Sequence, residues 1–270
     1  MSGLARVTLD EAIEAFERSL ARRPISENTR KAFVGDARIF ARELQTGRDA
    51  RVAPTSITPE RIKRFLAEQE RSTRAGSPKS IERRLTSLKV LFRWLRDNSY
   101  IAVDPAEGVA YRPFVDPLPE YLSDAQADSV IRAARALADG ERLELRPLTA
   151  IRLVLDTGIK KSECLNLGVD DIKRENGLAF IRIRYDKPHL RFKERDLTIS
   201  ADCLATVDEH IARYGGRGPL FDCTGRNLEY LLTGRVAPAA GVPALTFEMM
   251  RWTCALRLYR SRELAEEQLQ

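Results

Sequence analysis

The sequence lacks the features that mark membrane proteins, secreted disulfide-rich proteins and metalloproteins. No apolar run approaches the ~20 residues that span a bilayer, and the N-terminus has no signal-peptide core. The two histidines, His189 and His210, have no metal-binding spacing, and we expect both to be exposed. The four cysteines form no CxxC pair, which indicates neither zinc nor a disulfide framework. They are Cys164, Cys203, Cys223 and Cys254. We therefore expect a cytoplasmic protein with no metal and no cofactor, and with free, mostly buried thiols.

Acidic residues are scarce in one part of the chain only. Residues 1–117 carry 22 Lys and Arg against 16 Asp and Glu, whereas residues 118–270 carry 23 of each. The excess behind the net charge of +6 is therefore N-terminal. It is concentrated between Arg61 and Arg96, where 11 basic residues accompany 3 acidic ones. Such a concentration indicates a surface for a polyanion.

The N-terminal third has the periodicity of α-helices. Apolar residues recur at helical spacing from Leu9 to Leu20, and Ser26 is a cap residue for a second helix. Thr58-Pro59 and Ser77-Pro78 place proline at the first position of a third and a fourth helix. The fourth helix carries a set of basic residues mostly off its apolar stripe. They are Lys79, Arg83, Arg84, Lys89, Arg93 and Arg96. We predict that this helix binds DNA, the alternative being an ordinary solvated face.

Prolines separate this region from the rest. Asp104-Pro105, Pro113, Pro117 and Pro119 predict an extended linker over residues 104–119, because residues before proline avoid the helical conformation. We expect a helical domain over residues 1–103 and a second domain over residues 120–270, with the boundary near residue 117.

The second domain is predicted to mix helices with a small antiparallel sheet. Leu148 to Leu155 predicts a buried helix that stops at Gly158, and Leu178–Tyr185 with Arg195–Ile199 predicts a β-hairpin. The stretch from Gly225 to Pro243 is rich in turn residues and predicts no element. The expected fold is thus mainly α. Lys160 and Lys161 follow the Gly158 turn, at the junction with a new helix, where they are either solvated or bind phosphate.

The segment from Thr157 to Ile172 resembles the first arginine box of the tyrosine recombinase (phage integrase) family. The matching residues are Gly158, Ser162, Glu163, Leu167, Asp171 and Ile172, while Lys160 stands where the family has its first catalytic arginine. The N-terminal region resembles the family's core-binding domain. That likeness rests on Ser26, Asn28 and Thr29, on Ser77 to Leu85, on Phe92 and Trp94, and on Asp104-Pro105.

A segment near the C-terminal end, from Leu245 to Trp252, resembles the family's second box, His-x-x-Arg. Arg251 matches the second catalytic arginine, whereas Glu248 stands in place of the histidine. Spacing alone also favours a plain ion pair between Glu248 and Arg251 within one helix. The resemblance further implies a catalytic lysine on the hairpin loop, at Lys187 or, with a shifted register, at Lys193.

In the family, two arginines clamp a DNA phosphate that a tyrosine attacks, and no metal is needed. We expect Lys160, Lys187 and Arg251 to be remnants of that clamp, with Glu163 bracing the scaffold. The tyrosine of the family has no counterpart before Gln270, and Tyr259 follows Arg251 too closely to be it. We therefore predict a protein that binds double-stranded DNA, self-associates on it and does not cleave it. A truncated or divergent recombinase and a helical protein–protein adaptor are the alternatives.

Overall fold

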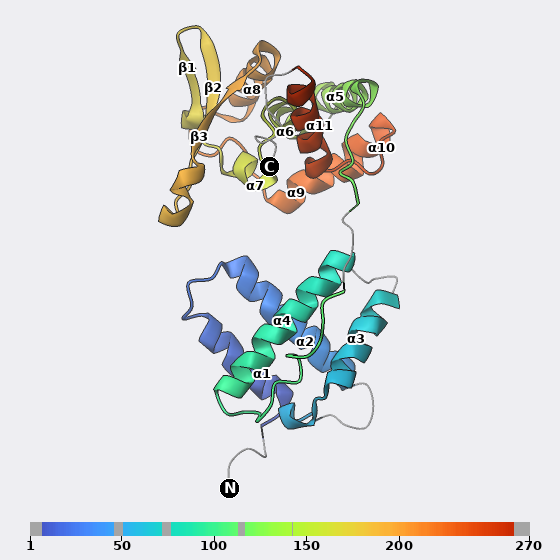
Figure 1. Ribbon diagram of the computed structural model, residues 1–270. Coiled ribbons are helices and arrows are strands. Elements are labelled where there is room, and N and C mark those ends of the chain that lie inside the picture. Colours follow the sequence, from blue (N-terminus) through green and yellow to red (C-terminus); the bar gives the residue numbers. More distant parts are fainter. Residues whose placement is uncertain (1–6, 46–50, 72–76, 113–116, 142, 262–270) are drawn as a thin grey trace. The chain divides into compact units, whose positions relative to one another are not determined.

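The computed structural model describes residues 7–45, 51–71, 77–112, 117–141 and 143–261. It divides into two compact units, Met1–Asp116 and Pro117–Gln270, each with its own hydrophobic core (Figure 1). None of the helices in these ranges has the length and apolar character needed to cross a bilayer.

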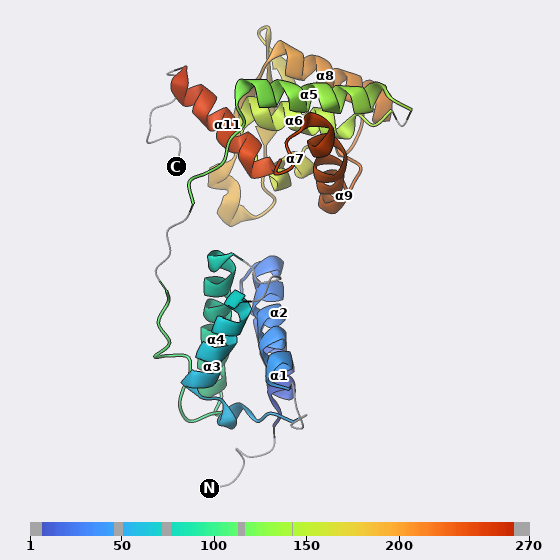
Figure 2. The same ribbon diagram turned by 90° about the vertical axis from the view of Figure 1, so that its right-hand side faces the viewer.

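Unit 1 is a helical bundle whose helices begin at the predicted residues. Its elements are α1 (Leu9–Leu20), α2 (Glu27–Leu44), the short 3-10 helix η1 (Pro54–Ser56), α3 (Pro59–Arg71) and α4 (Pro78–Asp97). The Ser26 hydroxyl accepts a hydrogen bond from the Thr29 amide and so caps α2. Proline occupies the first position of α3 and of α4, where no amide hydrogen is required. Both views show α2 and α4 beginning at the same end of the unit (Figures 1 and 2).

Aromatic side chains fill the centre of unit 1. Phe40 of α2 is fully buried, with its ring 5.0 Å from that of Phe65 and 6.0 Å from that of Phe92. Both pairs meet edge to face, an arrangement that stabilises aromatic contacts beyond the area they bury. Phe40 thereby joins α2, α3 and α4 in one core.

Part of the predicted linker belongs to this core. Ala106 and Val109 are buried, and the Asp104 carboxylate accepts a hydrogen bond of 2.8 Å from the Ala106 amide. Asp104 thus forms a local turn around Pro105 in place of extended chain, as aspartate before proline readily does. The prediction of an extended segment over residues 104–119 is wrong for residues 104–109. Pro113, another of the predicted linker prolines, lies outside the described residues.

Unit 2 surrounds a buried helix and has an antiparallel sheet at one side. Its helices are α5 (Asp124–Asp139), α6 (Arg146–Thr157), α7 (Lys161–Asn166), α8 (Ala201–Tyr214), α9 (Gly225–Leu231), α10 (Ala237–Ala240) and α11 (Phe247–Arg260). Short 3-10 helices are η2 (Val169–Asp171) and η3 (Pro188–Lys193), and η4 (Leu232–Val236) is a π-helix. The strands are β1 (Ile172–Glu175), β2 (Leu178–Ile183) and β3 (Arg195–Ile199).

The sheet has the order β1-β2-β3, and the pairing of β2 with β3 confirms the predicted hairpin. In its register Ile183 lies opposite Arg195, which places the Arg195 side chain on the same face of the sheet as the buried Ile183. Strand β1 was not predicted. The stretch from Gly225 to Pro243, which predicted no element, is largely helical.

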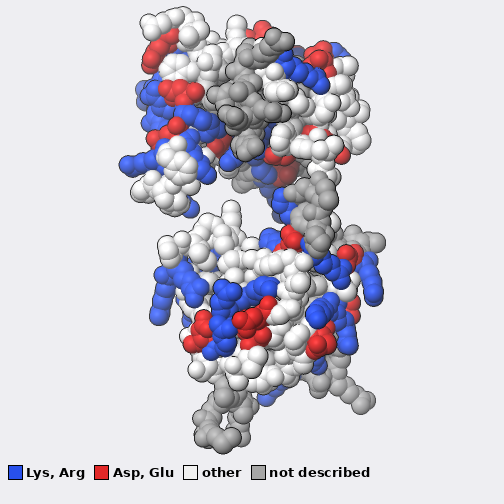
Figure 3. All heavy atoms as spheres, viewed as in Figure 1, with Lys and Arg blue, Asp and Glu red and all other residues white. Residues whose placement is uncertain are grey.

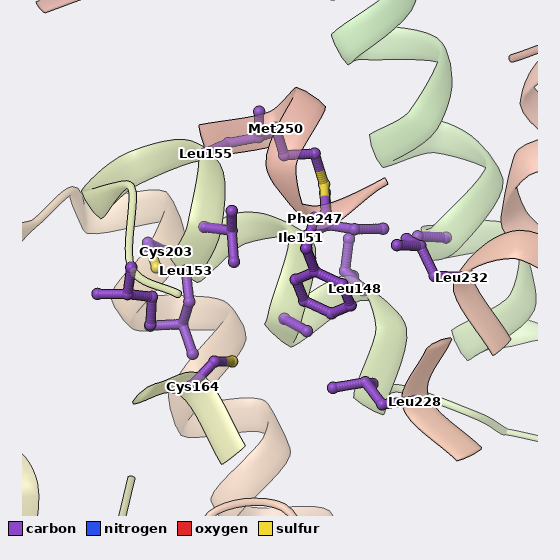
Figure 4. Close-up of a cluster of buried hydrophobic side chains, with 14 of the residues drawn as sticks. Leu148, Ile151, Leu153, Leu155, Cys164, Cys203, Leu228, Leu232, Phe247 and Met250 are labelled. Atoms are coloured by element: carbon purple, nitrogen blue, oxygen red, sulfur yellow. The ribbon is translucent and has the colours of Figure 1, made fainter. Parts of the chain in front are cut away.

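Helix α6 is the centre of the unit 2 core. Leu148 and Ile151 are fully buried and lie among side chains from α11, including Phe247 and Met250 (Figure 4). His210 of α8 is also buried, contrary to the exposure we expected from the sequence. Its ring nitrogens contact the Thr149 hydroxyl at 3.0 Å and the Leu220 carbonyl at 2.7 Å. Burial lowers the pKa of His210, so the neutral ring suits this environment.

Replacing Phe40 tests whether one aromatic core holds unit 1 together. Phe40→Ala should lower the free energy of unfolding of this unit by about 3–5 kcal/mol, because it leaves a cavity between α2, α3 and α4. Urea unfolding followed by tryptophan fluorescence in a Trp252→Phe background, where Trp94 of this core is the reporter, measures the change.

Phe192→Ala is the matched control, since Phe192 is 80% exposed and should cost little. Equal unfolding midpoints for Phe40→Ala and Phe192→Ala would contradict the described core.

Candidate functional site

The turn between α6 and α7 presents Lys160 to solvent. Gly158 ends α6 with φ +65°, a left-handed conformation that glycine adopts without steric cost, as the sequence pattern predicted. Lys160 is then extended and forms the cap position of α7, with its side chain exposed. The buried helix therefore ends in a fixed turn that carries a cation.

The buried carboxylate of Glu163 fixes this turn by accepting hydrogen bonds. It is only 5% exposed, and its carboxylate accepts hydrogen bonds from donors on separate parts of the unit. The Lys160 amide donates at 2.9 Å, Arg195 donates from Nη1 at 3.1 Å and from Nη2 at 3.0 Å, and the Tyr185 hydroxyl also donates. Burial alone would raise the pKa of Glu163, but the donors from Arg195, Tyr185 and Lys160 lower it to about 2. Glu163 is therefore an ionised carboxylate at neutral pH.

Arg251 of α11 reaches the same turn. Its Nε donates to the Gly158 carbonyl at 2.9 Å, and its Nη1 donates to Glu248 at 2.7 Å. The structure thus brings the arginine of the second box to the turn of the first box. The ion pair that the spacing of Glu248 and Arg251 favoured is also present. Glu248 itself is largely exposed, at 62% of its side chain.

The loop between β2 and β3 is anchored to this turn at both ends. Tyr185 lies two residues after the end of β2, Arg195 begins β3, and both donate to Glu163. Lys187 is exposed at the start of η3, and Lys193 is exposed at its end. The contacts with Glu163 are made by Tyr185 and Arg195, and the Lys187 side chain itself is exposed.

Sequence reasoning missed Tyr185 and Arg195 as site residues. Both were read only as hairpin positions, because their contact with Glu163 joins residues 22 and 32 positions apart. No local pattern reports such a pairing. Among the described residues, no group of three or more His, Cys, Asp and Glu side chains is placed to hold a metal ion.

The basic residues of α4 fall on different sides of the helix. Lys79, Arg83 and Arg93 are exposed. Lys89 donates to the Glu107 carbonyl at 3.2 Å, and Arg96 is paired with Asp97 at 3.1 Å. Figure 3 shows the Lys and Arg side chains of the visible face interspersed with Asp and Glu.

Arg84 differs from the other basic residues of α4, because it is turned toward the bundle. Only 13% of its side chain is exposed, and it donates to Gln69 of α3 at 2.6 Å. Arg84, one of the predicted DNA-binding cations, is therefore largely buried.

Glu163→Gln tests the buried carboxylate through its pH dependence. The folded pKa of about 2 lies below the ordinary value of 4.5. The ionised form therefore stabilises the fold fully above pH ~4.5, by about 3 kcal/mol, and loses this contribution as the pH falls toward ~2. The difference in free energy of unfolding between the wild type and Glu163→Gln should shrink across that window in urea titrations.

Glu229→Gln is the control for that series. It removes an exposed carboxylate paired with Lys161 at 2.7 Å, which should cost less than ~1 kcal/mol. A difference for Glu163→Gln that stayed constant from pH 5 to pH 2 would contradict the lowered pKa.

The sequence of the chain is similar to known protein families and proteins. The model of the phage integrase N-terminal SAM-like domain matches residues 13–99. Tyrosine recombinase XerC of Mycobacterium leprae is 30% identical over 258 residues, which are 91% of this chain and 84% of that protein. A tyrosine recombinase of Thermosipho africanus is 31% identical over 168 residues, 61% of this chain and 56% of that one.

Solved structures share the fold. A lambda integrase dimer bound to a COC' core site superimposes with a TM-score of 0.71, at 16% identity, covering 98% of this chain and 93% of that one. The Tn1549 transposon integrase in complex with a circular intermediate DNA gives a TM-score of 0.70, at 18% identity and with coverage of 98% and 90%. With the recombinase relatives, the matched N-terminal domain and the two boxes meeting at Gly158, the chain belongs to the tyrosine recombinase family.

Proposed function

We propose that this chain binds double-stranded DNA in the manner of a tyrosine recombinase and does not itself cleave the strands. The observation that carries the proposal is the hydrogen bond from Arg251 Nε to the Gly158 carbonyl. This bond is made two residues before the exposed Lys160, which supports a site where Arg251 and Lys160 face one phosphate.

The chemistry at this phosphate site is weakened by two substitutions. Lys160 supplies a single ammonium where the family has the planar fork of an arginine, so it can attract a phosphate but cannot hold it in a bidentate geometry. Glu248 supplies a carboxylate where the family has histidine. That carboxylate is an acceptor without a proton to donate, and it repels an approaching phosphate by a few kcal/mol at most, since solvent screens it. Lys187, which stands in place of the family's catalytic lysine, is exposed on its loop.

Binding to DNA is supported by the outward face of α4. Lys79, Arg83 and Arg93 lie on that face, and Lys89 and Arg96 lie beside it. Arg84 is left out of the proposed interface because it is largely buried. Cations on one helix face attract the phosphate backbone whatever the base sequence.

The partners of related structures agree with this proposal. The lambda integrase structure is that of a dimer bound to a core site, and another holds a lambda integrase tetramer bound to a Holliday junction. Double-stranded DNA is therefore the proposed ligand, and self-association on DNA is proposed with it.

Incubation with a nicked suicide duplex tests the proposed inactivity. No SDS-resistant protein–DNA adduct should form, because the phosphate site has lost both the guanidinium fork at Lys160 and the histidine at Glu248. The double variant Lys160→Arg with Glu248→His is the comparison, and it should bind the same duplex more tightly.

An adduct formed by the wild type would overturn the proposal and favour an active, divergent recombinase. Loss of that adduct in Tyr259→Phe would identify the nucleophile, since Tyr259 is 43% exposed on α11.

Salt dependence tests the proposed interface on α4. Each phosphate contact contributes about 0.9 to the slope of log K against log salt concentration. Replacing Lys79, Arg83 and Arg93 by glutamine should therefore lower the magnitude of the slope by roughly two to three, measured by fluorescence anisotropy with a labelled duplex.

A second triple variant with the same change in charge provides the control. It replaces Arg18, Arg38 and Arg112 by glutamine. These arginines are paired with Glu14, Glu17 and Glu70, respectively, in unit 1. This variant should change the slope little. Unchanged affinity and slope in the Lys79, Arg83 and Arg93 variant would instead show an ordinary solvated face and would favour the adaptor alternative.

A further inference from the structure

A buried carboxylate lies between α2 and α4. Asp36 of α2 is only 2% exposed, and it accepts hydrogen bonds from the Ser87 hydroxyl at 2.7 Å and from Nη1 of Arg83. Arg84 lies on its other side, with Nε 3.8 Å from Asp36 Oδ1. A charge this far from water is stable only with such partners.

The three charged side chains of this cluster do not balance one another. One carboxylate is shared by two guanidinium groups, and the further contact of Arg84 is with the neutral amide of Gln69. Arg84 is 13% exposed and Asp36 is 3% exposed, whereas Arg83 is 46% exposed at its side chain. Arg83 is therefore the charged side chain through which this cluster presents positive charge to solvent.

The contact with Asp36 leaves most of the Arg83 guanidinium available. A guanidinium has five donors in a rigid plane, and Asp36 is contacted by Nη1 alone. The plane is held by a buried acceptor that is itself fixed by Ser87. Arg83 can thus offer a pair of N–H groups to a ligand with little further loss of side-chain freedom.

The position of Arg83 on α4 suits a base and not only a phosphate. Lys79 and Arg93 share its outward face, one before it and one after it, about 21 Å apart along the helix at ~1.5 Å per residue. The major groove of DNA admits an α-helix, and cations near both ends of such a helix can contact the phosphates that border the groove. Arg83 lies between them, where base edges are exposed. Guanine O6 and N7 are the acceptor pair that a bidentate guanidinium fits best.

We propose that Arg83 reads a guanine in the major groove and that Asp36 is the residue that positions it. This inference rests on the proposed DNA binding and goes beyond it, since it assigns base selectivity to one side chain and its orientation to a buried one on another helix.

Selection from a pool of randomised duplexes tests the inference. Wild-type protein selects a preferred duplex at ~150 mM salt, and affinities are then measured for that duplex and for its single base-pair substitutions. The wild type should prefer G·C at one position by about 10- to 100-fold. Arg83→Lys, which keeps the charge but loses the fork, should reduce the preference at that position to less than about 3-fold and leave the other positions unchanged.

Asp36→Asn should weaken the same preference several-fold while the slope of affinity against salt stays within about one unit of the wild type. Glu17→Gln is the matched control, because it removes an exposed ion pair between α1 and α2, with Arg38 at 2.7 Å, and should leave every preference unchanged. Circular dichroism reports whether each variant folds. Should Asp36→Asn not fold, Asp36→Glu replaces it, since it keeps the charge but displaces the carboxylate by one methylene.

The outcomes distinguish a failure of the proposed DNA binding from a failure of the roles proposed for Arg83 and Asp36. Absence of salt-dependent binding by the wild type overturns the proposed function itself. Binding with an unchanged base preference in Arg83→Lys overturns the reading role, and an unchanged preference in a folded Asp36 variant overturns the positioning role.

Discussion

Glu163 is a carboxylate removed from water and surrounded by donors from the α6–α7 turn, from Tyr185 just after β2 and from Arg195 at the start of β3. Each of these elements also places an apolar residue in the core, Cys164 in α7, Ile183 in β2 and Ile199 in β3. The shared anion adds orientation to this packing, because every donor has its acceptor in one place. The geometry of Lys160 and of the loop that carries Lys187 follows from it.

Unit 1 uses the same device in a helical setting. Asp36, like Glu163, is a buried anion with a partly exposed arginine, and in both cases the cation faces solvent while its carboxylate does not. Such a pair adds little net stability compared with apolar packing. Its value is orientation, since a long side chain that would otherwise sample many rotamers is restricted to few. In this chain the two buried acids thereby restrict the positions of Arg83 and Arg195.

Local signals made much of this fold predictable. Ser26, Pro59 and Pro78 act within one turn of the helices they start, and the Gly158 turn follows from the residue's own conformational freedom. The strand β1 and the helices after Gly225 were missed because their stability comes from packing against other elements. The contacts of Glu163 and Asp36 span 32 and up to 51 residues, so periodicity cannot report them. The burial of Arg84, in contrast, could have been predicted from the sequence. Helical geometry places Arg84 on the same side of α4 as Leu88 and Leu91.

The ion pair between Glu248 and Arg251 makes phosphate binding at this corner an exchange of anions. A phosphate that reaches Arg251 Nη1 replaces a carboxylate already 2.7 Å away, so the number of ion pairs is conserved. Few small ions are then released at this contact, so its strength should depend weakly on salt. At Arg251 a phosphate would therefore compete with the Glu248 carboxylate and not only with water.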